Sequence, residues 1–332
     1  MTATDNKVPP LIDDATPAQI AAILGAMRAV ADTGRPASDK DRHAITSARR
    51  YMFGANGSFD VAALKPATPD DLASALAGTN LAENAIKFIT VMAFIDGELD
   101  RAKIAKVLRY ASALGMHQHY IDQIDEAANG HLQDVLADMI RCNMESITGK
   151  SWDGGDVNQW LLPYTGDHAN PSEAARFERL ADLRQDTFGR AFYDHFRRNN
   201  YGFPGDPTAL NGAFSLPHDS VHVLTGYNTT PRGEILVSTF TAAMHPYFPM
   251  GGHVLPVIFS WHLMVQINEI ARSAKDALDP DEFWRAWAAG AVATIDTFAP
   301  NYYFWSHVKE PLKEFRSRHA ILPQGLAGTV TA

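Results

Sequence analysis

The sequence contains a single cysteine, Cys142, among 332 residues. One thiol cannot form an internal disulfide, so a secreted scaffold held together by disulfides is excluded. The cysteine content is compatible with a reducing compartment. We interpret Cys142 as a small, buried, hydrophobic side chain.

Basic residues are also too few to give a positive balance. The chain has 29 Lys and Arg against 38 Asp and Glu, a net charge of -9, which argues against a nucleic-acid partner because phosphates would not be neutralised. The most apolar stretch, residues 254–270, contains a proline, a histidine and a glutamate, and is too polar to span a membrane unaided. The N-terminus shows no signal or transit peptide pattern. We therefore expect a cytoplasmic protein that is at most peripheral to the inner face of the cytoplasmic membrane.

The composition is that of a globular protein with a sizeable core. Hydrophobic residues make up 46% of the chain and charged residues 20%, and the length suffices for one large or two ordinary domains. Alternation with period two is almost absent from the first half. Thr16, Ser38 and Thr68 each precede a helical pattern in the position of an N-cap. These signals predict an all-α fold.

Residues 151–172 are rich in Gly, Pro and Asp and are the best candidate for a linker. They divide the chain into one helical domain at residues 16–150 and a second at residues 173–324. Residues 1–15, with two prolines and few apolar groups, are expected to be a disordered tail. The residues from 325 onward are expected to fray.

The first half contains the segment MAFIDGELD (residues 92–100), in which an Asp-Gly turn joins two predicted helices. Asp96, Glu98 and Asp100 have the spacing that starts an EF-hand loop, but the glycine comes too early and no glutamate stands at the twelfth position. We therefore interpret the segment as a solvated turn with Asp100 as the N-cap of the next helix. The segment resembles the TerB-like family of small helical domains, some of which bind metal at such a turn. This resemblance implies a TerB-like bundle over residues 16–150.

The second half contains a stronger candidate for a metal site. In LPHDSVH (residues 216–222), His218 and His222 are four residues apart, so on a helix they share a face, with Cβ atoms about 5–6 Å apart. Asp219 can reach from the flank of that face. Glu234 lies in the first turns of a second predicted helix and can supply a carboxylate from the opposite wall. This mixed nitrogen and oxygen set suits one divalent ion, with zinc first and iron, manganese or cobalt as alternatives.

The boundaries of these two helices follow from their prolines. Pro217 suits the first turn of the first helix, where its missing N–H costs nothing. Thr230 and Pro231 suit the N-cap and first position of the second helix. A chance His-x-x-x-His pair is the alternative to a metal site, since the chain has 13 histidines.

Three stretches together resemble the Coq4 family of ubiquinone-biosynthesis proteins. They are the pattern His-Asp-x-x-His-(eleven residues)-Glu, the segment DTFGRAF (residues 186–192) ahead of it, and YFWSHVKEPL (residues 303–312) after it. The resemblance implies a metal- and lipid-binding helical domain that removes the ring C1 carboxyl group, with oxidation, from a prenylated 4-hydroxybenzoate-derived intermediate. It also implies contact with other quinone-biosynthesis proteins.

The same resemblance assigns roles to individual residues. His218, Asp219, His222 and Glu234 become the expected metal ligands and catalytic group. Arg190 matches the family's Gly-Arg position, and we expect it to pair with an acidic group of the ligand or with Asp219. The family has no TerB-like half, so the substrate and the pathway stay open.

Several large apolar side chains follow Glu234. They fit either an ordinary core or an apolar channel for an isoprenoid tail beside the metal, because methionine and aromatic side chains suit a lipid-sized pocket. The residues that we expect to line this channel are Phe240, Met244, Phe259 and Trp261.

Three other interpretations compete with a Coq4-like enzyme. A zinc protease would carry Glu in place of Asp219, as His-Glu-x-x-His. A phosphohydrolase built on a His-Asp pair would need further ligands, for which His195 and Asp296 are available. A non-catalytic isoprenoid-binding scaffold that organises a quinone-biosynthetic complex fits the sequence as well as an enzyme does, because no general base is visible. A homodimer is also left open.

Overall fold

The computed structural model describes residues 11–153, 155–267 and 273–323. In these ranges the regular structure is helical, and extended pairing is limited to the isolated bridges Thr187–Pro311 and Leu263–Lys275. The predicted all-α fold is therefore confirmed. In the described part of the chain, every helix is too short or too polar to cross a bilayer.

The elements follow one another along the whole chain. The first half contains α1 (Pro17–Ala31), α2 (Asp39–Phe53), η1 (Val61–Ala63), α3 (Pro69–Leu76), α4 (Ala82–Met92), α5 (Arg101–Ala113), α6 (His119–Ala128) and α7 (Leu132–Thr148). The second half contains α8 (Val157–Leu161), η2 (Gly166–His168), α9 (Pro171–Glu178), η3 (Arg179–Asp182), α10 (Phe188–Arg198), α11 (Gly212–Thr225), α12 (Pro231–Met244), η4 (Pro249–Val254), α13 (Leu255–Trp261), α14 (Pro280–Val292), α15 (Phe304–His307) and α16 (Leu312–Arg318).

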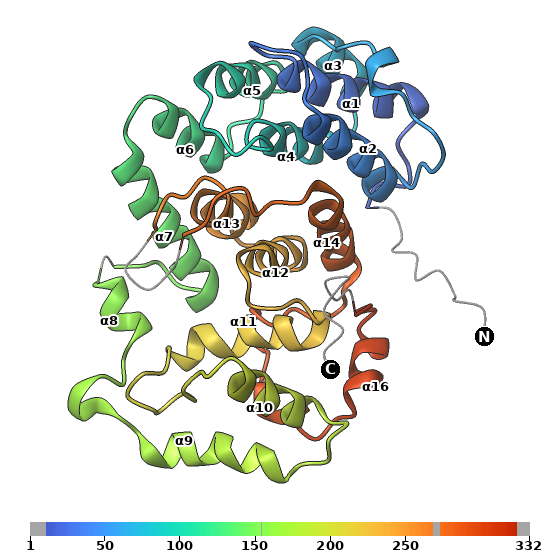
Figure 1. Cartoon of the computed structure of the whole chain (residues 1–332). Coiled ribbons are helices and arrows are strands. Elements are labelled where there is room, and N and C mark those ends of the chain that lie inside the picture. Colours follow the sequence, from blue (N-terminus) through green and yellow to red (C-terminus); the bar gives the residue numbers. More distant parts are fainter. Residues whose placement is uncertain (1–10, 154, 268–272, 324–332) are drawn as a thin grey trace.

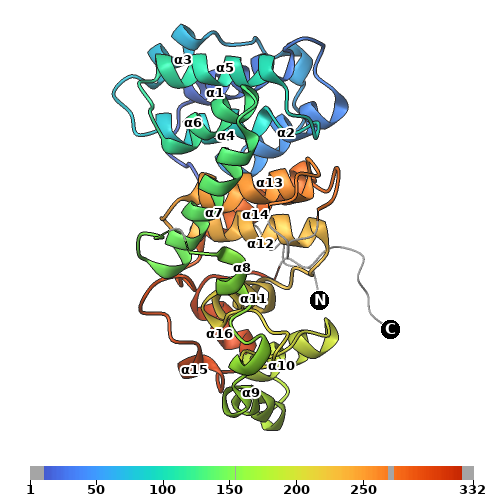
Figure 2. The ribbon, with the colours of Figure 1, turned by 90° about the vertical axis from the view of Figure 1, so that its left-hand side faces the viewer.

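The helices stack in three tiers (Figures 1 and 2). Helices α1–α6 form one end, α12–α14 form the middle, and α8–α11 with α15 and α16 form the other end. Helix α7 runs from the first tier into the middle one. The middle tier is therefore packed on both sides.

Two apolar cores hold the tiers together. The first core combines side chains of α1–α7 with side chains of η4, α13 and α14. Phe88 meets Trp284 edge to face at 5.3 Å between ring centroids, and Phe94 lies 5.7 Å from Phe259. The second core is rich in phenylalanine and joins α10–α12 to α14–α16. Because the first core draws on both halves, the division into two domains stays a prediction.

The predicted helix starts are correct at most positions. Thr16, Ser38 and Thr68 each accept a hydrogen bond from the third residue of their helix and form a capping box. Asp100 accepts a hydrogen bond from the N–H of Ala102 at 2.7 Å and caps α5. Pro311 stands directly before α16, at its N-cap position.

The predicted disordered tail and the predicted linker both contain residues that pack against the rest of the protein. Residues 1–10 of the predicted tail lie outside the described residues, but Ile12 is buried and its N–H donates to the carbonyl of Met52 at 2.8 Å. The predicted linker at residues 151–172 contains α8, and the buried Leu161 accepts a hydrogen bond from the N–H of Asn211 at 2.8 Å. Polar composition does not reveal such contacts, because a few apolar side chains and the backbone make them. The predicted fraying tail from residue 325 lies outside the described residues.

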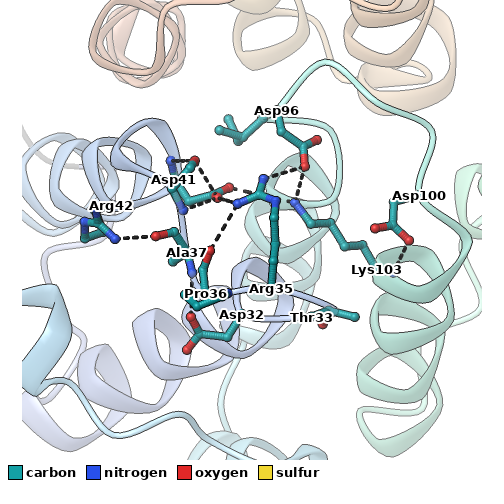
Figure 3. Close-up of polar contacts among 12 residues, drawn as sticks. Asp32, Thr33, Arg35, Pro36, Ala37, Asp41, Arg42, Asp96, Asp100 and Lys103 are labelled. Carbon is teal, nitrogen blue, oxygen red and sulfur yellow. Dashed lines mark hydrogen bonds and ion pairs between the residues drawn. The ribbon is translucent and has the colours of Figure 1, made fainter.

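The Asp-Gly turn before α5 is not simply solvated. Asp96 Oδ2 lies 2.5 Å from Lys103 Nζ and 2.9 Å from Arg35 Nη2 (Figure 3). Arg35 also pairs with Asp41 at 3.2 Å, and the Lys103 and Asp41 side chains are fully buried. Two cations thus balance two carboxylates, and an ammonium group lies where a metal would contact Asp96.

Candidate metal centre

The two helices of the metal motif form, but the first begins earlier than predicted. Helix α11 starts at Gly212 with Asn211 as its N-cap, so Pro217 lies inside the helix and not in its first turn. Its missing N–H removes one helical hydrogen bond, while its carbonyl accepts a hydrogen bond from the Thr297 hydroxyl at 3.1 Å. Helix α12 begins as predicted, with Thr230 as its N-cap and Pro231 at its first position.

Two glycines set the position of Glu234 relative to α11. Gly226 ends α11 with φ +81°, a left-handed conformation that glycine adopts without strain. At Gly233, a Cβ atom would lie 1.9 Å from the carbonyl oxygen of Asn228. Only glycine therefore lets the connecting loop pack against the first turn of α12. Glu234 lies in this turn, and its side chain extends toward the two histidines.

The side chains of His218, His222 and Glu234 converge on one point. His218 Nε2 lies 3.2 Å from Glu234 Oε2 and 3.2 Å from His222 Nε2. His222 Nε2 lies 3.4 Å from Glu234 Oε1. We refer to these three residues as the His–His–Glu group. Two imidazoles and one carboxylate are the donors of catalytic zinc sites and of 2-His-1-carboxylate iron sites, so the group fits a divalent metal.

A hydrogen bond at its second ring nitrogen fixes the orientation of His222. Its Nδ1 donates to the carbonyl of Tyr227 at 3.0 Å, which points Nε2 toward Glu234. Metal-ligating histidines commonly have such a partner on their second nitrogen. Its side chain is also fully buried, so the ring has little freedom to turn away.

Charge complementarity shifts the pKa values of this pair in opposite directions. Burial acts to lower the pKa of His222, but the charge of Glu234 and its hydrogen bond outweigh burial and raise that pKa to about 8. Burial acts to raise the pKa of Glu234, but the two imidazoles outweigh it and hold that pKa far below its usual range. The carboxylate is therefore ionised at neutral pH, as a metal ligand must be.

Asp219 does not join the His–His–Glu group. Its Oδ1 lies 2.8 Å from Nε2 of His195, which comes from α10. The His195 ring stacks against His222 with 5.3 Å between centroids, and its Nδ1 lies 3.3 Å from Asn199 Nδ2. Residues 218 and 219 are about 100° apart around a helix, so the two side chains face different neighbours. Asp219 and His195 thus support His222 from the side.

His195 was the residue that sequence reasoning undervalued. It continues the apolar face of α10 with Phe188, Phe192 and Phe196 at helical spacing, and it is buried. A histidine on such a face can be interpreted as a polar group directed at a buried partner, and that signal was present in the sequence. The partner, Asp219, becomes visible only when α10 is placed beside α11.

Arg190 takes no part in this site. Its Nε lies 3.0 Å from Asp194 Oδ1, one turn further along α10, and its Nη1 donates to the carbonyl of Ala181 at 3.0 Å. The expected pairing of Arg190 with Asp219 is therefore wrong, because a local partner four residues away satisfies the guanidinium.

The His–His–Glu group opens onto a cavity of about 660 Å³, and His218 and Glu234 lie in its wall. That volume is within the range of about 300–1,000 Å³ typical of small-molecule sites. Most of the wall comes from α7, α8, α10, α11, α12, η4, α13 and the loop before α11, and it carries both apolar and polar side chains. Representative apolar members are Met139, Met144, Val257 and Trp261.

The predicted apolar channel is made largely of other residues. Trp261 lines the cavity, as expected. Phe259 is buried in the first core and Phe240 in the second, and Met244 packs against the second core. Sequence cannot separate core from cavity here, because both select the same side chains.

A second group of possible ligands occurs on α6 and α7. His119, Asp138 and Cys142 offer atoms within 4.8 Å of one another. However, Arg141 Nη2 lies 2.6 Å from Asp138 Oδ1 and 3.5 Å from Cys142 Sγ. Burial raises the pKa of the Cys142 thiol to about 11, so the thiol stays protonated at neutral pH and the group is the weaker candidate. Cys142 is buried, as predicted.

The ligand set of a phosphohydrolase does not assemble. Asp296, which that interpretation needed, lies 2.8 Å from His245 Nδ1 through its Oδ2. His195 does meet Asp219, but His222 belongs to the His–His–Glu group. The geometry therefore favours a site built on two histidines and Glu234.

No protein-family model matches this chain, and a search of curated proteins found no match. The Coq4-like and TerB-like resemblances consequently rest on the sequence motifs, and they stay predictions.

Proposed function

We propose that this protein is a metal-dependent enzyme of ubiquinone or related prenylquinone biosynthesis, acting on the head group of a prenylated 4-hydroxybenzoate-derived intermediate. The observation that supports this proposal is that the His–His–Glu group borders a cavity lined by apolar and polar side chains, with His218 and Glu234 in its wall. The three motifs that resemble the Coq4 family supply the substrate class.

The cavity offers a place for each part of such a ligand. The carboxylate would approach the metal held by His218, His222 and Glu234, since three protein ligands leave positions open. The prenyl tail would lie along Met139, Met144, Val257 and Trp261. A bound divalent metal would supply Lewis acidity at the carboxylate or, if it is iron, redox chemistry.

The proposed conversion replaces the ring C1 carboxyl group by a hydroxyl group. With dioxygen as oxidant, one oxygen atom enters the ring and carbon dioxide leaves. The other oxygen atom becomes water, and a reductant supplies two electrons and two protons. The protein's own residues bind and orient the ring, and His195 with Asp219 keeps the His222 imidazole in place.

The alternative is an isoprenoid-binding scaffold without catalysis. The apolar part of the cavity favours it, because a wall that suits a prenyl tail requires no reaction at the metal. The two functions make opposite predictions for substitutions. An enzyme should be most sensitive at Glu234, and a scaffold should be most sensitive to a bulky change such as Val257→Trp.

The test is an assay of metal-loaded protein with 3-geranyl-4-hydroxybenzoate, dioxygen and a reductant, in which released carbon dioxide is measured. We expect turnover in wild type, none in Glu234→Ala, and wild-type turnover in Glu282→Gln, whose carboxylate pairs with Arg232 outside the site. Full activity of folded Glu234→Ala, in vitro or in complementation of a cell that lacks the protein, would rule out the enzyme. Binding without turnover would favour the scaffold.

A further inference from the structure

Helix α12 presents a polar face to the cavity beyond its metal-binding end. Glu234, Ser238 and Thr241 are spaced at i, i+4 and i+7, so they share one side of the helix, and all three line the cavity. Several other residues of α12 are buried and apolar, including Ile235, Leu236 and Val237. The polar face therefore runs from the His–His–Glu group into the cavity.

The hydroxyl of Thr241 has no hydrogen-bond partner among the described residues, although Thr241 is only 1% exposed. Other buried threonines of α11 and α12 bond to their own helix. Thr239 donates to the carbonyl of Ile235 at 2.7 Å, and Thr225 donates to that of Val221 at 2.7 Å. A buried hydroxyl without a partner is costly and calls for an explanation. Because Thr241 is one of the residues that line the cavity, a ligand group that reaches its hydroxyl would supply the missing bond.

The surroundings of Thr241 favour an uncharged ligand group. His245, one turn further along α12, is paired with Asp296 at 2.8 Å. The His245 ring lies 6.0 Å from that of His253, which also lines the cavity. Burial lowers the pKa of His253 to about 3, and its Nε2 lies 2.7 Å from Ser146 Oγ. His253 is therefore neutral at neutral pH, and this end of the cavity offers hydrogen bonds without a free charge.

The separation along α12 gives a length for the ligand. Seven residues of α-helix rise about 10 Å from Glu234 to Thr241. A benzene ring that carries a carboxylate and a para hydroxyl spans this length when the carboxylate–metal contact and the hydrogen bond to the Thr241 hydroxyl are included. We propose that Thr241 hydrogen-bonds the ring hydroxyl para to the metal-bound carboxylate and so makes the site specific for 4-hydroxybenzoates. This inference rests on the proposed function, because it places the carboxylate at the His–His–Glu group.

Ser215 is the other buried hydroxyl in the cavity wall that lacks a partner among the described residues. It precedes His218 by one helical turn, so it lies beside the metal-binding end. A group at Ser215 would meet the carboxylate end of the ligand. The para hydroxyl is accordingly assigned to Thr241.

The test compares two ligands that differ only in this hydroxyl. Metal-loaded full-length protein is titrated calorimetrically with 3-geranyl-4-hydroxybenzoate and with 3-geranylbenzoate. We expect wild type to prefer the hydroxylated ligand by roughly five- to tenfold, the value of one neutral hydrogen bond. Thr241→Val, which keeps the shape, should abolish the preference and leave the Kd of 3-geranylbenzoate unchanged or lower. Thr239→Val is the matched control and should keep the preference.

Other outcomes would overturn the inference. Equal affinities of wild type for both ligands, or a preference retained by Thr241→Val, would contradict the role of Thr241. A preference lost in Ser215→Ala and not in Thr241→Val would move the hydroxyl to the other end of the site. These results leave the proposed function standing, whereas failure of wild type to bind either ligand would overturn both.

Discussion

Replacing Glu234 in metal-free protein should lower the pKa of His222. Glu234→Gln keeps the shape of the side chain and removes the charge that lies 3.4 Å from His222 Nε2. Burial acts to lower this pKa, and Glu234 is the principal group that raises it to about 8. Without that charge, burial dominates and the pKa should fall below its ordinary value of 6.5. A fall of about 1.5 or more corresponds to about 2 kcal/mol of interaction.

The assay is an NMR titration of the His222 ring proton in chelator-treated protein. The resonance is assigned with His222→Ala, and circular dichroism checks the helicity of each variant. Glu282→Gln is the control and should leave the pKa at about 8, because Glu282 pairs with Arg232 on the far side of α12. A pKa that stays at about 8 in Glu234→Gln would refute the reasoning and leave Asp219 as the source of the shift.

Three further predictions concern stability and metal binding. In chelator-treated protein, the protonated form of His222 is favoured by folding, so its contribution to stability is complete below pH 6.5 and is lost as the pH rises through about 8. Urea denaturation should show the advantage of wild type over Glu234→Gln shrinking across that range, and a constant difference would contradict it. Lys103→Met leaves two buried carboxylates without their ammonium partner and should cost about 3–5 kcal/mol of unfolding free energy. Lys40→Met, at a partly exposed pair, should cost less than about 1 kcal/mol in the same urea experiment, and similar losses would be evidence against a buried ion network. Asp219→Asn should retain one metal per chain by elemental analysis, with affinity reduced by no more than about 10–100-fold; a folded variant without metal would make Asp219 a ligand.

The features that depend on residues close in the sequence could be predicted from the sequence. Thr16, Ser38, Thr68 and Thr230 were identified as N-caps because a cap and its helix are neighbours in the sequence. The pair of His218 and His222 followed from helical spacing in the same way. These elements needed no knowledge of the tertiary fold.

Contacts between distant segments could not be predicted in this way. Pro217 suggested a helix start, but Asn211 caps the helix and α11 tolerates the proline in its interior. The sequence predicts Asp219 at the flank of the metal, yet Asp219 faces His195 of α10. The partner of Arg190, by contrast, is local and can be predicted from the sequence, because Asp194 stands one turn further along the same helix.

The lining of the cavity could not be predicted from the sequence for a different reason. Phe240 and Phe259 were expected in a channel, and both are in the cores. Apolar pattern reveals that a side chain is buried, but not whether its neighbour is another side chain or a ligand. Thr241 is more informative about the cavity, because its buried hydroxyl has no hydrogen-bond partner among the described residues and a ligand can provide one. That signal exists only once the neighbours are placed.

The measurement that tests the central claim most directly is metal content per chain in purified protein. Wild type, His222→Ala and His119→Ala should be supplied with zinc, iron or manganese, desalted and analysed, with circular dichroism as the check on folding. We expect about one divalent ion per chain in wild type and in His119→Ala, and none in folded His222→Ala. No metal in folded wild type, or metal lost in His119→Ala and kept in His222→Ala, would contradict it.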